Sequence, residues 1–205
     1  MKSASNLLER LNTLPFFGKN TVYQLGKQLG LAPASVKTYI SRYMKNREVL
    51  QLKNGLYVAA HYFSSHGNDV SYVYYLANVL RTPSYVSSWA ALQYYGLTTE
   101  AIKVVTSVTS KVGRSYVTKA GNFVYQSIQK PLFKDFVLVR GKFDFFMATP
   151  AKAVFDTLYF KTHQFRGIEL NKVWKLIDEL RIDLDEMEEK DRSSLRAMLN
   201  TYFYE

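Results

Sequence analysis

The sequence predicts an α+β protein in which a small N-terminal domain of helices and a hairpin precedes a larger domain with a sheet and C-terminal helices. Apolar residues recur at helical spacing before residue 46 and again after Pro150. Runs of β-branched and aromatic residues, broken by glycines, occupy residues 102–146. A polar, turn-rich segment, residues 61–69, separates the two patterns. We therefore expect one domain at residues 1–62 and a second at residues 70–205.

Length and composition restrict the class of protein. The chain has 205 residues with 47% hydrophobic and 21% charged residues, which is typical of folded domains of this size. It contains no cysteine and three histidines, which argues against disulfides and thiolate metal sites. No apolar run approaches the roughly 20 residues that span a bilayer. We expect a cytoplasmic protein without a metal or another cofactor.

The positive charge is distributed unevenly along the chain. The formal net charge is +10, and residues 1–62 carry nine Lys and Arg against two acids. Residues 63–145 carry nine against four, whereas residues 146–205 carry nine against eleven. A basic N-terminal third is typical of a protein that binds an anionic polymer at that end.

Two helices joined by a short turn are predicted in the N-terminal third. Asn20 is a favourable N-cap for a helix that Gly30 ends. Pro33 favours the first position of a new helix and disfavours helical geometry at Ala32.

The second of these helices has two distinct faces over residues 35–45. Placed at about 100° per residue, its apolar residues fall on one arc and its polar residues on the other. The apolar arc holds Val36, Tyr39, Ile40, Tyr43 and Met44. The polar arc holds three cations, three hydroxyls and no acid: Ser35, Lys37, Thr38, Ser41, Arg42 and Lys45. These side chains suit phosphates and base edges.

A β-hairpin is predicted directly after this helix. Asn54-Gly55 joins two apolar runs, and this dipeptide favours a two-residue turn, which places Lys53 at the tip. A helix-turn-helix followed by a basic hairpin is typical of a winged helix-turn-helix domain that binds duplex DNA. The alternative is a module of the same fold that packs on protein.

The second domain is predicted to begin with helices at residues 70–80 and 87–95, in a segment rich in tyrosine and tryptophan. These aromatics are interpreted as core residues, with a stacking platform for single strands as the alternative. The next segment predicts an antiparallel sheet, and the end of the chain predicts helices. An acidic run at residues 183–191 is interpreted as a solvated helix entry, with a divalent-cation site or a mimic of a nucleic-acid backbone as the alternatives.

No catalytic constellation was found. The chain lacks a phosphate-binding glycine loop, a His-Glu-x-x-His motif and a Gly-x-Ser-x-Gly elbow. Glu188-Glu189-Lys190 matches a nuclease fragment but lies in a helix-prone acidic run. The sequence therefore does not support an enzyme.

Three segments together resemble the AbiEi-type antitoxins, which are transcriptional regulators of viral defence systems. Residues 20–59 resemble the family's winged helix, with its Gly-hydrophobic-Tyr-Val phrase at residues 55–58. Residues 85–98 resemble the segment Ser-x-x-Ala-Leu-x-x-x-Gly-Leu, and residues 147–159 resemble Ala-Thr-Pro-Glu-Lys-Ala-Leu-x-Asp. The similarity covers roughly residues 15–165 and departs at Ala151, where the family usually has glutamate.

The resemblance implies a type IV antitoxin encoded beside a nucleotidyltransferase-like toxin, with which no stable complex is expected. It implies that the winged helix represses its own operon through inverted repeats. Because a single winged helix reads only a short site, we also expect two protomers per operator that associate on DNA. A basic set is the candidate antitoxin surface, with ordinary solubilising charge as its alternative: Lys103, Lys111, Arg114 and Lys119. A regulator whose second domain dimerises or senses a ligand, and an enzyme with a DNA-targeting module, remain as other functions.

Overall fold

The computed structural model describes the backbone of residues 2–204 and the side chains of residues 6–204. It contains two compact units. Unit 1 comprises Met1–Leu76 and Tyr116–Gly121, and unit 2 comprises Ala77–Ser115 and Asn122–Glu205. The protein is α+β with helices at its C-terminal end, as the sequence predicts.

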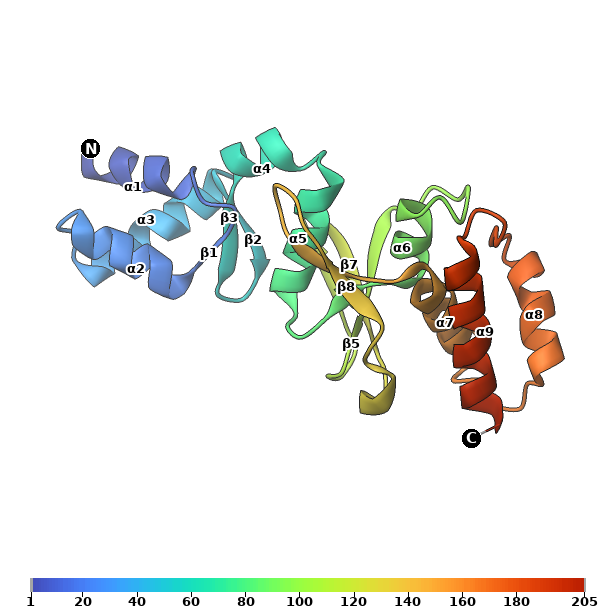
Figure 1. Ribbon diagram of the computed structural model, residues 1–205. Coiled ribbons are helices and arrows are strands. Elements are labelled where there is room, and N and C mark those ends of the chain that lie inside the picture. The colour runs from blue at the N-terminus through green and yellow to red at the C-terminus, as the bar shows by residue number, and fades with distance from the viewer. Residues whose placement is uncertain (1, 205) are drawn as a thin grey trace. The chain divides into compact units, whose positions relative to one another are not determined.

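Unit 1 consists of short helices around a three-stranded antiparallel sheet of order β1-β3-β2 (Figure 1). Its elements are α1 (Lys2–Leu11), β1 (Phe17–Gly18), α2 (Lys19–Gln28), α3 (Pro33–Lys45), β2 (Val49–Lys53), β3 (Leu56–Ala59) and α4 (Ala60–His66). Leu7, Leu11, Phe17, Val22 and Val36 form the centre of its apolar core.

The predicted turn between α2 and α3 is present. Gly30 has a φ of +69°, which favours glycine and ends α2, and Pro33 occupies the first turn of α3. The expected cap at Asn20 is wrong, because α2 begins at Lys19 and Asn20 is already its second residue. Gly18 is the N-cap instead, since its extended backbone still pairs with Leu56 in the sheet.

The segment predicted as a linker is mostly helical. Residues 60–66 form α4, in which the Tyr62 ring stacks on His66 at 4.2 Å and also contacts Tyr72. The Tyr72 hydroxyl donates to the Pro15 carbonyl at 2.6 Å. These aromatic contacts hold α4 and the start of α5 (Val70–Leu80) within unit 1. The units are thus divided inside α5, whereas domains at 1–62 and 70–205 stay a prediction.

Unit 2 is built on a mixed sheet of order β6-β7-β5-β4-β9-β8, of which part of β6 and the first residue of β7 are assigned to unit 1. The strands are β4 (Tyr85–Val86), β5 (Val104–Thr109), β6 (Arg114–Thr118), β7 (Gly121–Ser127), β8 (Phe136–Val139) and β9 (Phe145–Ala148).

The predicted purely antiparallel sheet is wrong. The pairs β4–β5 and β8–β9 are antiparallel, but β5–β7 and β4–β9 are parallel. Glycine-marked turns predict which strands are consecutive, but they do not determine which strand of each pair docks on the centre of the sheet. Here the later strand of each pair docks on the centre: β7 pairs with β5, and β9 pairs with β4.

The helices of unit 2 are α6 (Ser88–Tyr94), the short η1 (Lys130–Leu132), α7 (Pro150–Lys161), α8 (Leu170–Glu179) and α9 (Glu189–Tyr204). Helix α7 packs against α6, α8 and α9 (Figure 1). Every residue of α7 from Ala151 to Tyr159 is buried. This helix is therefore central to unit 2. Tyr72 and Tyr85 are fully buried, as expected for core residues, although Tyr94 is 45% exposed.

No helix in the described part of the chain is both long and apolar enough to cross a membrane.

Candidate nucleic-acid interface

The two faces of α3 lie as the sequence predicts. Val36, Ile40 and Tyr43 are buried against the core of unit 1. Ser35 is half-buried, and the rest of the polar arc is exposed: Lys37, Thr38, Ser41, Arg42 and Lys45. The structure thus places six predicted residues on one exposed or half-exposed face that carries three cations and no carboxylate.

Close packing of α2 on α3 fixes the direction of this face. A Cβ atom at Gly26 would lie 2.3 Å from Cγ2 of Val36, so only glycine permits the observed approach of the two helices. At the other end of α3, burial, followed by the charges of Glu48 and Tyr39, raises the pKa of Tyr43 to about 12. This phenol is therefore neutral at physiological pH.

One hydroxyl on the face already has a partner. Thr38 Oγ1 donates to the carbonyl of Ala34 at 3.0 Å. Its proton is directed at the helix, so the oxygen offers a ligand a hydrogen-bond acceptor. Thr38 therefore suits a donor such as a base amino group better than it suits a phosphate oxygen.

The hairpin places Lys53 as predicted. Lys53 is half-buried and pairs with Leu56 across the turn Asn54-Gly55, where Gly55 has a φ of +80°. A Cβ atom at Gly55 would lie 3.8 Å from Cε of Lys19, which brings the hairpin turn beside the first residue of α2.

Lys19 is a candidate residue that the sequence analysis missed. It is exposed and lines a groove of about 460 Å³ together with Lys37 and Ser41 of α3. The other lining side chains are Val22, Tyr23, Val36, Ile40, Met44 and Tyr57. Cations beside an apolar floor suit a sugar–phosphate backbone, since the cations bind phosphate and the floor contacts the sugar. Only the pairing of β1 with β3 reveals this proximity.

The candidate antitoxin residues do not all belong to one unit. Lys103, Lys111 and Arg114 lie in unit 2, whereas Lys119 lies in unit 1. All four are exposed, but the ammonium of Lys111 donates to the Thr82 carbonyl at 2.7 Å and so has a structural role.

A buried polar network in unit 2 is a second feature that the sequence analysis missed. Lys152 Nζ lies 2.7 Å from Asp156 Oδ1, with side chains 2% and 0% exposed. Asp156 Oδ2 accepts from Ser87 Oγ at 2.6 Å and from the Tyr85 hydroxyl at 3.0 Å. Burial raises the pKa of Asp156, and Lys152, Ser87 and Tyr85 oppose that effect. The available signal was a Lys and an Asp four residues apart in a helix whose neighbouring residues are mostly apolar.

These four residues lie in residues 85–98 and 147–159, the two segments of unit 2 on which the expected similarity to the AbiEi-type antitoxins depends. Ala151, at the position where that family usually has glutamate, is fully buried. A glutamate carboxylate at this buried position would need a hydrogen-bond or ion-pair partner, whereas the methyl group of Ala151 needs none.

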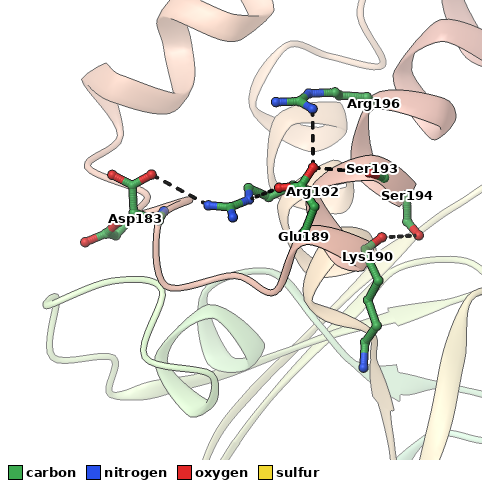
Figure 2. A network of polar contacts seen from close by, with 8 residues as sticks. Asp183, Glu189, Lys190, Arg192, Ser193, Ser194 and Arg196 are labelled. Atoms are coloured by element: carbon green, nitrogen blue, oxygen red, sulfur yellow. Dashed lines mark hydrogen bonds and ion pairs between the residues drawn. The ribbon is translucent and has the colours of Figure 1, made fainter.

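The acidic run forms ion pairs at the start of α9 (Figure 2). Arg192 contacts Glu189 at 3.0 Å and Asp185 at 3.8 Å, and Arg196 contacts Glu189 at 3.7 Å. Within residues 2–204, no group of three His, Asp or Glu is arranged to hold a metal ion. The run is thus a charged, largely exposed helix entry.

No protein-family model matches the chain, and no curated protein matches it either. The resemblance to the AbiEi-type antitoxins therefore rests on the three segments described above.

Proposed function

We propose that unit 1 is a winged helix that binds duplex DNA and represses transcription. The observation that carries the proposal is the acid-free face of α3, which lies exposed beside a basic hairpin. An ordinary solvated helix face mixes both signs of charge, whereas a face that meets phosphates excludes carboxylates.

The residues of this face have different roles in the proposed complex. Ser35, Thr38 and Arg42 lie nearest the base edges, where arginine can form two hydrogen bonds to guanine. Lys37, Lys45 and Lys53 bind phosphates, and Lys19 joins them because of its place beside the hairpin turn. Ser41 contacts either group through its hydroxyl.

Two protomers occupy one operator in this proposal. A single winged helix reads a short site, and repressors gain specificity from two half-sites related by symmetry. We expect inverted repeats upstream of the chain's own gene and association of the protomers on DNA.

We further propose that the protein is a type IV antitoxin that counteracts a nucleotidyltransferase-like toxin without a stable complex. The resemblance of residues 85–98 and 147–159 to AbiEi-type antitoxins carries this part. A contact between the two segments supports this part: Ser87 of the first donates a hydrogen bond to Asp156 of the second, so both contribute to one buried network. Unit 2 then holds the antitoxin activity, and Lys103, Lys111 and Arg114 are its candidate surface.

A regulator whose unit 2 senses a ligand is the second candidate function. A hollow of about 810 Å³ in unit 2 favours it, because its lining includes the buried Lys152.

Full-length point variants separate these functions. A shortened chain that begins at Val70 would divide unit 1, because the part of α5 up to Leu76 belongs to that unit. The test therefore compares Lys37→Ala/Arg42→Ala with Lys172→Ala/Lys175→Ala, which removes two exposed cations of α8. Repression is measured with a reporter on the upstream promoter, and rescue is measured with the neighbouring toxin gene.

We expect the α3 variant to lose repression and to retain rescue, and the α8 variant to retain both. Loss of rescue in a folded α3 variant would contradict the assignment of the antitoxin activity to unit 2. If the wild type represses the promoter but neither it nor any variant rescues cells from the toxin, the ligand-sensing regulator is favoured.

A further inference from the structure

A second candidate site lies in unit 2, whereas the residues of the proposed DNA interface belong to unit 1. A hollow of about 810 Å³ is bounded by residues of η1, the start of β8, α7 and α9. It is lined by Gln129, Pro131, Leu132, Lys134, Asp135, Lys152, Phe155, Ser194, Ala197, Met198, Thr201 and Tyr202. This volume accommodates a small organic molecule.

Lys152 and Asp156 differ in how many polar partners each has. Asp156 interacts with three donors, namely Lys152, Ser87 and Tyr85. An ammonium group has three N–H donors. Within the described residues, Lys152 Nζ has one carboxylate partner, Asp156 Oδ1, and one ring, that of Phe155, whose centroid is 4.7 Å away.

A buried ammonium with spare donors favours a further acceptor, because an unmatched buried donor costs free energy. Lys152 and Phe155 both line the hollow. Carboxylate oxygens are strong acceptors for an ammonium, and such charge-assisted hydrogen bonds exceed neutral ones in strength. Pro131, Leu132 and Met198 supply apolar surface for the body of the same molecule.

The charges of the site determine how many charges the ligand carries. Two cations, Lys134 and Lys152, and one carboxylate, Asp135, line the hollow, so the formal charge of its lining is +1. A dianion such as a phosphate monoester would leave one negative charge unbalanced beside Asp135. A ligand with a single negative charge balances the lining.

We propose that this hollow binds a small carboxylate with an apolar or aromatic body, and that its carboxylate accepts hydrogen bonds from Lys152. This site is independent of the proposed DNA binding, since none of its residues lies in unit 1.

The test uses the full chain with methyl-labelled methionine. The chain has five methionines, of which Met198 lines the hollow, whereas Met44 lies in unit 1 and Met147 is fully buried elsewhere in unit 2. Benzoate, its neutral analogue benzamide, and phenyl phosphate are titrated separately. We expect benzoate to shift the Met198 methyl signal saturably, with an affinity at least tenfold higher than that of either other compound.

Two variants test the contacts. Lys152→Met should lower benzoate affinity at least tenfold. Because this change also affects folding, Ala197→Phe provides a second test: Ala197 is exposed on α9 and lines the hollow, so the ring should fill the site. Asn200→Phe, at an exposed α9 position outside the lining, should retain binding.

Equal responses to benzoate and benzamide would overturn the proposal, as would tighter binding of phenyl phosphate. Shifts of similar size at all methionines, or unchanged benzoate binding by a folded Ala197→Phe variant, would also overturn it.

Discussion

Replacement of Lys152 by methionine tests how far the buried network stabilises unit 2. The change preserves an apolar chain of similar length but leaves the carboxylate of Asp156, which is 0% exposed, without its cation. Breaking a buried ion pair from one side costs about 3–5 kcal/mol. At roughly 3 °C per kcal/mol for a protein of this size, the melting temperature should fall by about 10–15 °C.

Tryptophan fluorescence reports the relevant transition, because the two tryptophans of the chain, Trp89 and Trp174, both lie in unit 2. Arg140→Met is the matched control. The Arg140–Asp144 pair has the same spacing and a distance of 2.9 Å, but its side chains are 77% and 39% exposed. Solvent screens such a pair, so the control should melt within the error of the wild type.

The loss of stability caused by Lys152→Met should depend on pH. Without the ammonium, burial holds the pKa of Asp156 further above its unfolded value. A carboxyl with a raised folded pKa binds its proton more tightly in the native state, so lowering the pH through that pKa favours folding. The loss of stability should therefore be largest at neutral pH and become smaller toward pH 4. Equal melting of Lys152→Met and Arg140→Met at pH 7 would refute this account of the network.

Three further changes test other parts of the structure. Gly26→Ala should destabilise unit 1 by about 1–3 kcal/mol, because its Cβ would overlap Val36, and hydrogen exchange in α2 and α3 measures this. Gly141→Ala is its control, since a Cβ there meets nothing within 4 Å, and equal exchange in both variants would contradict the prediction. Lys19→Ala should weaken binding to all DNA sequences alike and lower the salt slope by about 1; a loss confined to the operator would instead indicate base reading. Ala151→Glu should lower the stability of unit 2 by several kcal/mol in urea, because the favourable helix N-terminus offsets at most about 2 kcal/mol of the burial cost. An unchanged urea midpoint would show that the site accommodates the carboxylate.

Local pattern was sufficient to predict the face of α3. Helical periodicity alone separates Val36 and Ile40 from Lys37 and Arg42, and the structure places them accordingly. The hairpin was equally accessible, because Asn54-Gly55 has few other favourable conformations. Both predictions depend on neighbours within a few residues.

Long-range pairing was not predictable in the same way. Lys19 approaches the hairpin only because Gly18 pairs with Leu56, and nothing near Lys19 in the sequence encodes that partner. The parallel pairs of the sheet likewise depend on which strand docks at the centre. The segment 61–69 appeared polar because Ser, His, Gly and Asn dominate it, yet Tyr62, Phe63 and His66 all contact Tyr72.

Binding of α3 to DNA is the central claim, and fluorescence anisotropy over a range of salt concentrations tests it most directly. The probes are duplex DNA from upstream of the chain's own gene and a random duplex of equal length. The proteins are the wild type, Lys37→Ala/Arg42→Ala and the α8 control Lys172→Ala/Lys175→Ala. We predict that the α3 variant loses at least tenfold in affinity for the upstream DNA, loses its preference over random DNA, and shows a salt slope lower by about 1, while the control matches the wild type. Equal binding by the two variants, or equal loss in both, would contradict the account.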